Sequence, residues 1–219
     1  MLLSLSCVAY GSPYQSRILG GFPNKAFLYE HHYLKKDPWV EIEAVIPQIG
    51  AAMNPKWQSE INEVIKLRVE GFIRETLESA QKTKEMYPQA AFPHAGLVDY
   101  EVRLNKGGLL SLTLTFYQYT GGAHGMTYLE AINLDLTTGQ VLEFEDVLPE
   151  PAQRARLAEI INGEVKKDPA RFLIPEFTAD MFQEPQGFYL QEKSIVVYFG
   201  LYEIAPYVSG IQKFTFPLE

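Results

Sequence analysis

The chain has 219 residues, of which 47% are hydrophobic and 21% are charged, and its formal net charge is −8. This composition is typical of one large globular domain or two small ones, so extensive disorder is not expected. The acidic balance makes nucleic acids and anionic lipid surfaces poor partners, whereas a basic protein or a neutral glycan is compatible with it. The single cysteine, Cys7, excludes an intramolecular disulfide.

The first twelve residues, MLLSLSCVAYGS, resemble the end of an export signal. A complete signal has a basic region and an apolar run of about 7–15 residues, and this segment has neither. The stretch LSLSC also resembles a lipoprotein cleavage site with Cys7 as the lipidated residue. We therefore expect residues 1–26 to be a residual export signal and linker, and the protein to be extracytoplasmic; an ordinary apolar first strand is the alternative. No stretch reaches the ~18 apolar residues of a transmembrane helix.

Two strands and a long helix are predicted in the first third of the chain. Residues 27–36 and 39–47 are predicted strands, and apolar and polar side chains alternate in the second of them. A helix is expected to begin at Asn54, a favoured N-cap, with Pro55 at the first helical position. Its apolar residues recur every three or four positions, at Ile61, Ile65, Val69, Phe72, Ile73 and Leu77. The helix should end before Tyr87-Pro88.

The rest of the chain is predicted to be mostly strands with one further main helix. Strands are expected at residues 97–104, 109–119, 126–136, 140–144, 188–190, 194–201 and 212–217, a short helical turn at 145–148 and a second helix at 152–166. This order predicts an α+β fold, a largely antiparallel sheet with two main helices packed on one face. We expect two intertwined subdomains, an N-terminal one at residues 27–104 and a C-terminal one at residues 105–219.

A histidine lies in a glycine-rich turn, in the stretch YQYTGGAHGMTY at residues 117–128. Gly121, Gly122 and Gly125 permit positive φ angles or the close approach of another chain segment. One interpretation is a ligand-contacting loop in which the His124 imidazole donates or accepts a hydrogen bond. The other is a tight strand connection in which His124 caps a backbone group.

A second loop has a similar composition, in the stretch YEIAPYVSG at residues 202–210. Pro206 favours an extended or turn conformation before it. Tyrosines near the two loops are either contact residues or strand formers; they are Tyr117, Tyr119, Tyr128, Tyr202 and Tyr207. The sequence neighbours of Glu203 are apolar. If Glu203 is buried, its charged carboxylate needs a partner; the alternative is that the side chain points outward to solvent.

No cofactor or metal is expected from the motifs of the chain. The four histidines, His31, His32, His94 and His124, do not have zinc-type spacing. The sequence contains neither a nucleophile elbow nor a phosphate-binding glycine loop. A hydrolase that uses His124 and a nearby carboxylate as acid and base is the least favoured hypothesis.

Two long stretches resemble a known family. They are LSLTLTFYQYTGGAHGMTYLEAINLDLTTGQVLEFEDVL and FYLQEKSIVVYFGLYEIAPYVSGIQKFTFPL. Both are similar to a family of bacterial extracytoplasmic domains of unknown function. Members form the outer part of RsiV-type anti-sigma factors, which sense lysozyme, and similar domains precede the catalytic domain of a peptidoglycan deacetylase. The resemblance runs from about residue 40 to residue 218.

The resemblance implies a non-catalytic recognition module of the cell envelope that binds lysozyme or a similar wall-active protein. A peptidoglycan- or glycan-binding module is the alternative. Neither an anti-sigma segment nor a deacetylase domain with metal-binding histidines is recognisable in the sequence. We expect the two loops to come together as one aromatic contact surface. The ligand-binding residues expected are Tyr117, Tyr119, Gly121, Gly122, His124, Gly125, Tyr202, Pro206 and Tyr207.

Overall fold

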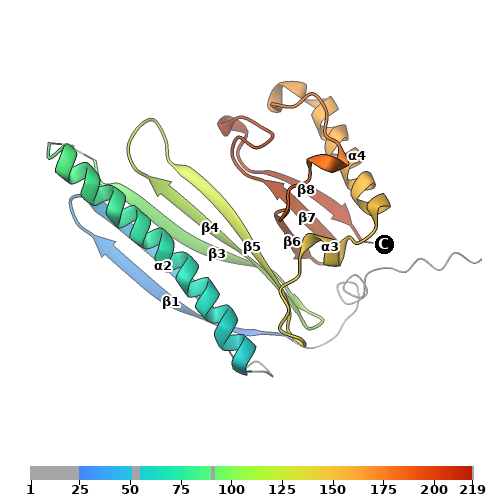
Figure 1. Ribbon diagram of the computed structural model, residues 1–219, viewed down its shortest axis with the longest axis horizontal. Coiled ribbons are helices and arrows are strands. Elements are labelled where there is room, and N and C mark those ends of the chain that lie inside the picture. The colour runs from blue at the N-terminus through green and yellow to red at the C-terminus, as the bar shows by residue number, and fades with distance from the viewer. Residues whose placement is uncertain (1–24, 51–54, 90–91, 219) are drawn as a thin grey trace, which may run out of the picture.

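The computed structural model describes residues 25–50, 55–89 and 92–218. In these residues two β-sheets are each covered by one main helix (Figure 1). The larger sheet has the strand order β1-β2-β3-β4-β5. Its strands are β1 (Phe27–Lys36), β2 (Val40–Gly50), β3 (His94–Lys106), β4 (Leu109–Tyr119) and β5 (Met126–Asp135).

Helix α2 (Pro55–Met86) connects β2 to β3 and explains the one parallel pair of the larger sheet. β2 and β3 pair in parallel, and the other neighbours pair antiparallel. Parallel neighbours need a long crossover connection, and here the helix supplies it. Because α2 packs on the sheet that it connects, its apolar stripe is buried at Ile61, Ile65, Val69 and Ile73. The helix predicted from the periodicity is confirmed, although Asn54 lies outside the described residues.

The smaller sheet has three antiparallel strands, β6 (Phe188–Gln191), β7 (Ser194–Phe199) and β8 (Gln212–Pro217). Helix α4 (Pro151–Lys167) covers it, and the short helix α3 (Phe144–Val147) precedes α4. Three 3₁₀ turns complete the domain, η1 (Pro169–Arg171), η2 (Ala179–Met181) and η3 (Tyr207–Ser209). Within the described residues no helix is both long and apolar enough to span a membrane.

The α+β fold class is confirmed, with two differences in arrangement. The two main helices do not share one sheet face, because each covers its own sheet and its own apolar core. Residues 140–144 do not form a strand; only Val141 bridges to Leu134. The chain instead turns into α3, where the Glu143 N–H donates to the Asp146 carboxylate at 2.9 Å and Phe144 is buried.

Buried polar side chains join the two sheets. The Ser111 hydroxyl of β4 accepts a hydrogen bond from the Leu190 N–H of β6 at 3.0 Å and donates to the Asn133 side-chain oxygen at 2.7 Å. The Asn133 amide donates to the Phe188 carbonyl oxygen at 3.0 Å. These bonds satisfy polar groups where β6 meets β4 and β5, so the sheets are fixed relative to each other.

A domain boundary after Leu104 would cut through the larger sheet, because β3 and β4 form one hairpin. Gly107 and Gly108 at its turn have the positive φ angles, 65° and 70°, that a tight hairpin requires. The larger sheet continues to Asp135. We therefore propose that the boundary between the two subdomains lies after Asp135.

The buried His94 side chain should make the stability of the fold depend on pH. Its side chain is 1% exposed, both ring nitrogens lack a hydrogen-bond partner, and burial lowers its pKa from the usual 6.5. The unfolded chain therefore binds the proton more readily than the folded one, so stability is full above pH ~6.5 and falls as the pH drops through that value. Thermal melts between pH 5 and pH 8 should show a flatter profile for His94→Leu than for the natural chain.

The matched control for this prediction is His31→Gln, because His31 is an exposed histidine on β1. Its melting profile should run parallel to that of the natural chain. Parallel profiles for His94→Leu and the natural chain would show instead that His94 does not contribute to the acid sensitivity.

Candidate recognition surface

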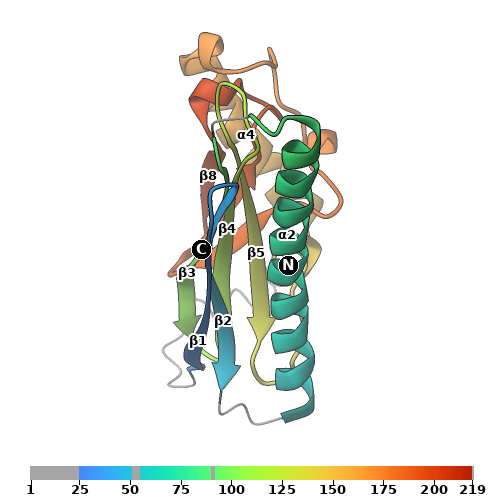
Figure 2. The ribbon, with the colours of Figure 1, turned by 90° about the vertical axis from the view of Figure 1, so that its left-hand side faces the viewer.

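The two loops singled out in the sequence meet at one end of the molecule (Figure 2). The first connects β4 to β5, and the second connects β7 to β8. The His124 ring stacks on the Tyr207 ring with centroids 3.7 Å apart and an angle of 21° between the planes. The Tyr207 hydroxyl also donates a hydrogen bond to the Gly125 carbonyl oxygen at 2.9 Å. We call the exposed side chains of His124, Tyr202 and Val208, with the half-buried Tyr207, the two-loop surface.

The Gly125 carbonyl oxygen fixes the orientation of both rings. It lies 3.1 Å from His124 Nδ1 as well as 2.9 Å from the Tyr207 hydroxyl. A carbonyl oxygen only accepts hydrogen bonds, so Nδ1 is the nitrogen that carries the proton in this arrangement. The imidazole is thus held between a hydrogen bond on its edge and an aromatic ring on its face.

Two glycines allow the first loop to pass close to aromatic rings. A Cβ atom on Gly125 would lie 2.5 Å from the Tyr117 ring, and one on Gly121, whose φ is +103°, would lie 2.7 Å from the Phe92 ring. The Tyr119 hydroxyl donates to the Gly122 carbonyl oxygen at 3.0 Å. Tyr117 and Tyr119 therefore support the loop from the side of the sheet, and both are half-buried.

The second loop is anchored in the core of the smaller domain. Ile204 and Ala205 are buried, and the Ile204 carbonyl oxygen accepts a hydrogen bond from the Leu173 N–H at 2.8 Å. Pro206 then has an extended conformation, with φ −66° and ψ 159°, and Tyr207 begins η3. The buried pair fixes the position from which Tyr207 reaches the first loop.

Beyond this anchor the second loop exposes apolar surface. Tyr202 is 51% exposed, with its ring centroid 5.9 Å from that of Tyr207, and Val208 is 89% exposed. Glu203 is exposed beside them and needs no buried partner. A shallow groove of about 580 Å³ adjoins Tyr207 and Val208, lined also by Thr127, Leu201, Gly210, Ile211 and Lys213. Burial is the main reason why the pKa of Lys213 is lowered.

The structure brings the nine sequence-predicted residues into neighbouring positions, but it gives them different environments. The Tyr207 ring lies beside the rings of both His124 and Tyr202. Tyr117, Tyr119 and the glycines shape the first loop, and Pro206 directs the second. Sequence reasoning missed Val208 and Lys213, because neither residue type nor spacing distinguishes them from ordinary loop and strand residues.

No group of three or more His, Cys, Asp or Glu side chains suited to holding a metal occurs in the described parts of the chain. The histidines are distributed between the edge strand β1, the core and the first loop. The hydrogen bond of His124 is made to a backbone carbonyl oxygen, so its polar contact serves the loop conformation.

The fold defines a two-domain α+β protein in which each sheet carries its own helix, and solved structures share this architecture. A DUF3298-family structure from Bacteroides fragilis has a TM-score of 0.69 and 16% sequence identity, covering 88% of this chain and 90% of the other. One from Pseudomonas aeruginosa has a TM-score of 0.51 and 20% identity, covering 91% and 92%. Identities this low establish a common fold only.

The sequence comparisons identify the two parts. Residues 34–127 match the family described as Deacetylase PdaC, and residues 145–219 match the Protein of unknown function DUF3298. The N-terminal part of the chain is therefore similar to a PdaC-like domain, and the C-terminal part is similar to a DUF3298 domain. It is also 28% identical over 123 residues to the peptidoglycan-N-acetylmuramic acid deacetylase PdaC of Bacillus subtilis, spanning 53% of this chain but only 26% of that protein.

Proposed function

We propose that this chain is a non-catalytic recognition module of the bacterial cell envelope, and that its two-loop surface binds a wall-active protein such as lysozyme. The envelope location is proposed from the related deacetylase, whose name specifies a peptidoglycan substrate. The observation that carries the binding proposal is the stacked pair His124–Tyr207, which fixes loops of both domains into one surface.

Exposure and preorganisation support a protein partner. Tyr202 and Val208 present apolar surface to solvent, and tyrosine is a residue that protein interfaces favour at their energetic centres. The hydrogen bond from Tyr207 to Gly125 and the buried anchor at Ile204 keep both loops in place before binding. Such preorganisation reduces the conformational entropy that is lost on association.

The negative net charge of the chain favours a basic protein as the partner. The chain carries a net charge of −8, and Glu203 is exposed next to Tyr202. Opposite charge on a partner accelerates association and favours correct orientation, and salt weakens this effect. Lysozyme is the basic wall-active protein that the family resemblance suggests.

The contacts of the His124 ring favour a role in recognition over a role in hydrolysis. Its ring face lies against Tyr207 and its Nδ1 lies against a backbone carbonyl oxygen. Acid–base catalysis would need a second polar side chain within hydrogen-bond reach of the ring, and within the described residues His124 hydrogen-bonds only to this carbonyl oxygen. In this loop the stacking on Tyr207 joins the two domains, and the hydrogen bond to Gly125 holds the loop conformation.

The binding proposal predicts a large effect of Val208→Asp. Because Val208 is almost fully exposed, the change should leave the fold intact. It removes apolar contact area and requires a carboxylate to be desolvated in the interface, a short-range loss that the salt-screened attraction to a basic partner does not offset. Isothermal titration with lysozyme should show affinity reduced at least ~10-fold, which corresponds to about 1.4 kcal/mol.

The matched control is Val64→Asp, which changes an exposed valine on the outer face of α2, away from the two loops. This variant should bind lysozyme as the natural chain does. The proposal fails if the natural chain gives no heat at ~100 µM, or if Val208→Asp binds with unchanged affinity.

A further inference from the structure

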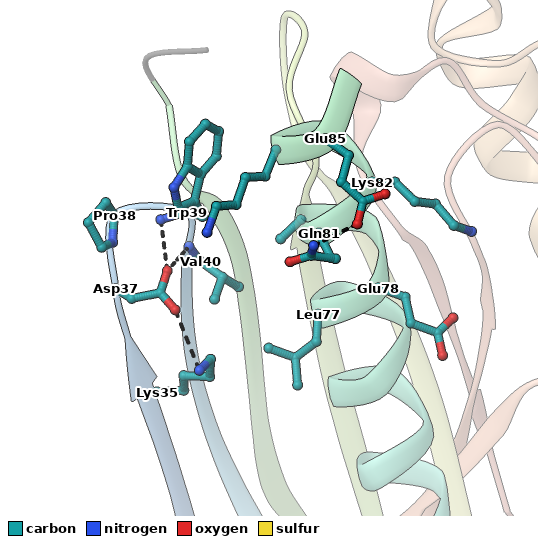
Figure 3. Close-up of a pocket in the computed structure, with 12 residues that line it drawn as sticks. Lys35, Asp37, Pro38, Trp39, Val40, Leu77, Glu78, Gln81, Lys82 and Glu85 are labelled. Atoms are coloured by element: carbon teal, nitrogen blue, oxygen red, sulfur yellow. Dashed lines mark hydrogen bonds and ion pairs between the residues drawn. The ribbon is translucent and has the colours of Figure 1, made fainter. Parts of the chain in front are cut away.

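A second concave surface lies on the PdaC-like domain, at the end of α2. It is a groove of about 890 Å³ between the β1–β2 turn and the last turns of the helix (Figure 3). This volume is within the range of small-molecule sites, which are usually concave and combine an apolar floor with a few polar groups. Its apolar part is formed by Trp39, Val40, Leu77 and Ala80.

The turn that bears Trp39 is held in a fixed shape. The Asp37 carboxylate accepts hydrogen bonds from the N–H groups of Trp39 at 2.8 Å and Val40 at 3.0 Å, and Lys35 Nζ lies 3.4 Å from it. The first of these bonds is the main cause of the lowered pKa of Asp37. In Figure 3 the Trp39 indole stands at the top of the turn, and Leu77 points from the helix into the gap. The groove is therefore shaped before any ligand arrives.

A flexible cation faces the indole. The Lys84 ammonium lies 5.8 Å from the centroid of the Trp39 ring, within the range of a cation–π contact. It can donate three hydrogen bonds. The Gln81 amide, paired with Glu85 at 2.7 Å, adds donors and acceptors on the helix side. An aromatic ring with donors and acceptors around it suits a ligand that has an apolar face and polar edges.

The charges of the groove balance one another. Three lysines and three carboxylates line it: Lys35, Lys82 and Lys84 with Asp37, Glu78 and Glu85. Figure 3 shows Glu78 and Lys82 on the side of α2 that faces away from the turn, which leaves two charges of each sign nearer the gap. A balanced groove gives little electrostatic preference to an anion or a cation.

We propose that this groove binds a neutral saccharide, with a sugar ring on the Trp39 indole and its hydroxyl groups hydrogen-bonded to Lys84, Asp37 and Gln81. A pyranose ring has an apolar face of C–H groups and an edge of hydroxyls, which matches the indole and the surrounding polar groups. The site shares no lining residue with the two-loop surface or its groove, so it adds a second ligand to the proposed function.

The two tryptophans of the chain provide the test. In ¹H–¹⁵N spectra, neutral tetrasaccharides (tetra-N-acetylchitotetraose, cellotetraose and maltotetraose) at up to about 10 mM should shift the indole N–H signal of Trp39. The signal of Trp57, which is buried in the core, should stay in place. Trp39→Ala should weaken the calorimetric affinity for the responding sugar at least 10-fold, and Lys84→Gln several-fold.

Two control variants separate this site from others. Lys66→Gln changes an exposed lysine of the same helix that pairs with Glu63 and Glu70, and it should bind the sugar as the natural chain does. Val208→Asp should also leave sugar binding unchanged, so failure of the two-loop proposal and failure of this one are distinguishable.

Three results would overturn the saccharide site. The first is the absence of a Trp39 shift with all three neutral sugars. The second is an unchanged affinity in Trp39→Ala. The third is a response only to a charged oligosaccharide, tested with a fully deacetylated chitosan tetramer and a tetragalacturonate, because charge would then be the feature that the groove recognises.

Discussion

Replacing Gly125 with alanine is expected to lower the free energy of unfolding by about 2–3 kcal/mol, the upper part of the range for overpacking a well-packed site. The new Cβ would lie 2.5 Å from the outer end of the half-buried Tyr117 ring, so the ring and the loop beside it have to move apart. Because the Gly125 carbonyl oxygen holds Tyr207, the same change should separate the two loops and weaken lysozyme binding.

Urea denaturation measures the first effect and calorimetric titration the second. Gly163→Ala is the matched control, since a Cβ there meets nothing within 4 Å and the position lies in α4. Alanine in a helix is more favourable than glycine by up to about 1 kcal/mol, so this variant should be slightly stabilised. If Gly125→Ala were as stable as the natural chain, the close packing of the first loop against Tyr117 would be refuted.

Replacing Asn62 with alanine is expected to lower the free energy of unfolding by about 3 kcal/mol, because two buried backbone groups lose their partners. The Asn62 side chain accepts from the Ile49 N–H and donates to the Ile49 carbonyl oxygen, both at 2.8 Å. The parallel pairing of β2 with β3 ends at Ala44, so beyond it the amide takes the place of a neighbouring strand. Its loss would detach α2 from the end of β2.

Asn162 offers an internal comparison with the same chemistry. Its side chain makes the same pair of hydrogen bonds with the backbone of Phe177, both at 2.9 Å, but it is only half-buried. Asn162→Ala should therefore cost about 1–2 kcal/mol, less than Asn62→Ala, because water can enter the half-exposed position that the amide leaves and bond to the released groups. Denaturation of the two variants side by side checks this order, and equal losses would contradict the role given to burial.

Local patterns predicted most of the fold. The apolar stripe of α2, the alternation in β2 and the paired glycines at residues 107–108 are each decided by nearby residues, and the structure confirms them. Residues 140–144 have a strand-like pattern, but the burial of Phe144 and the start of α3 determine their conformation. The way the two sheets are joined depends on polar contacts between distant segments, such as Ser111 with Leu190, which no local pattern reveals.

The candidate site was predictable in part. Glycine, histidine and proline identify the two loops, and their meeting was expected from the resemblance and their shared composition. The exposed Val208 and the Trp39 groove depend on how surfaces face each other in the fold. Trp39 and Lys84 are 45 positions apart and come together only because α2 runs back along the hairpin.

The most direct test of the two-loop surface is an amide NMR titration of the isotopically labelled chain with lysozyme. The proposal predicts that the Gly125 and Val208 signals shift together with one saturation curve, because one partner covers both loops. Shifts confined to a single loop, or located only on other surfaces, would contradict a shared recognition surface.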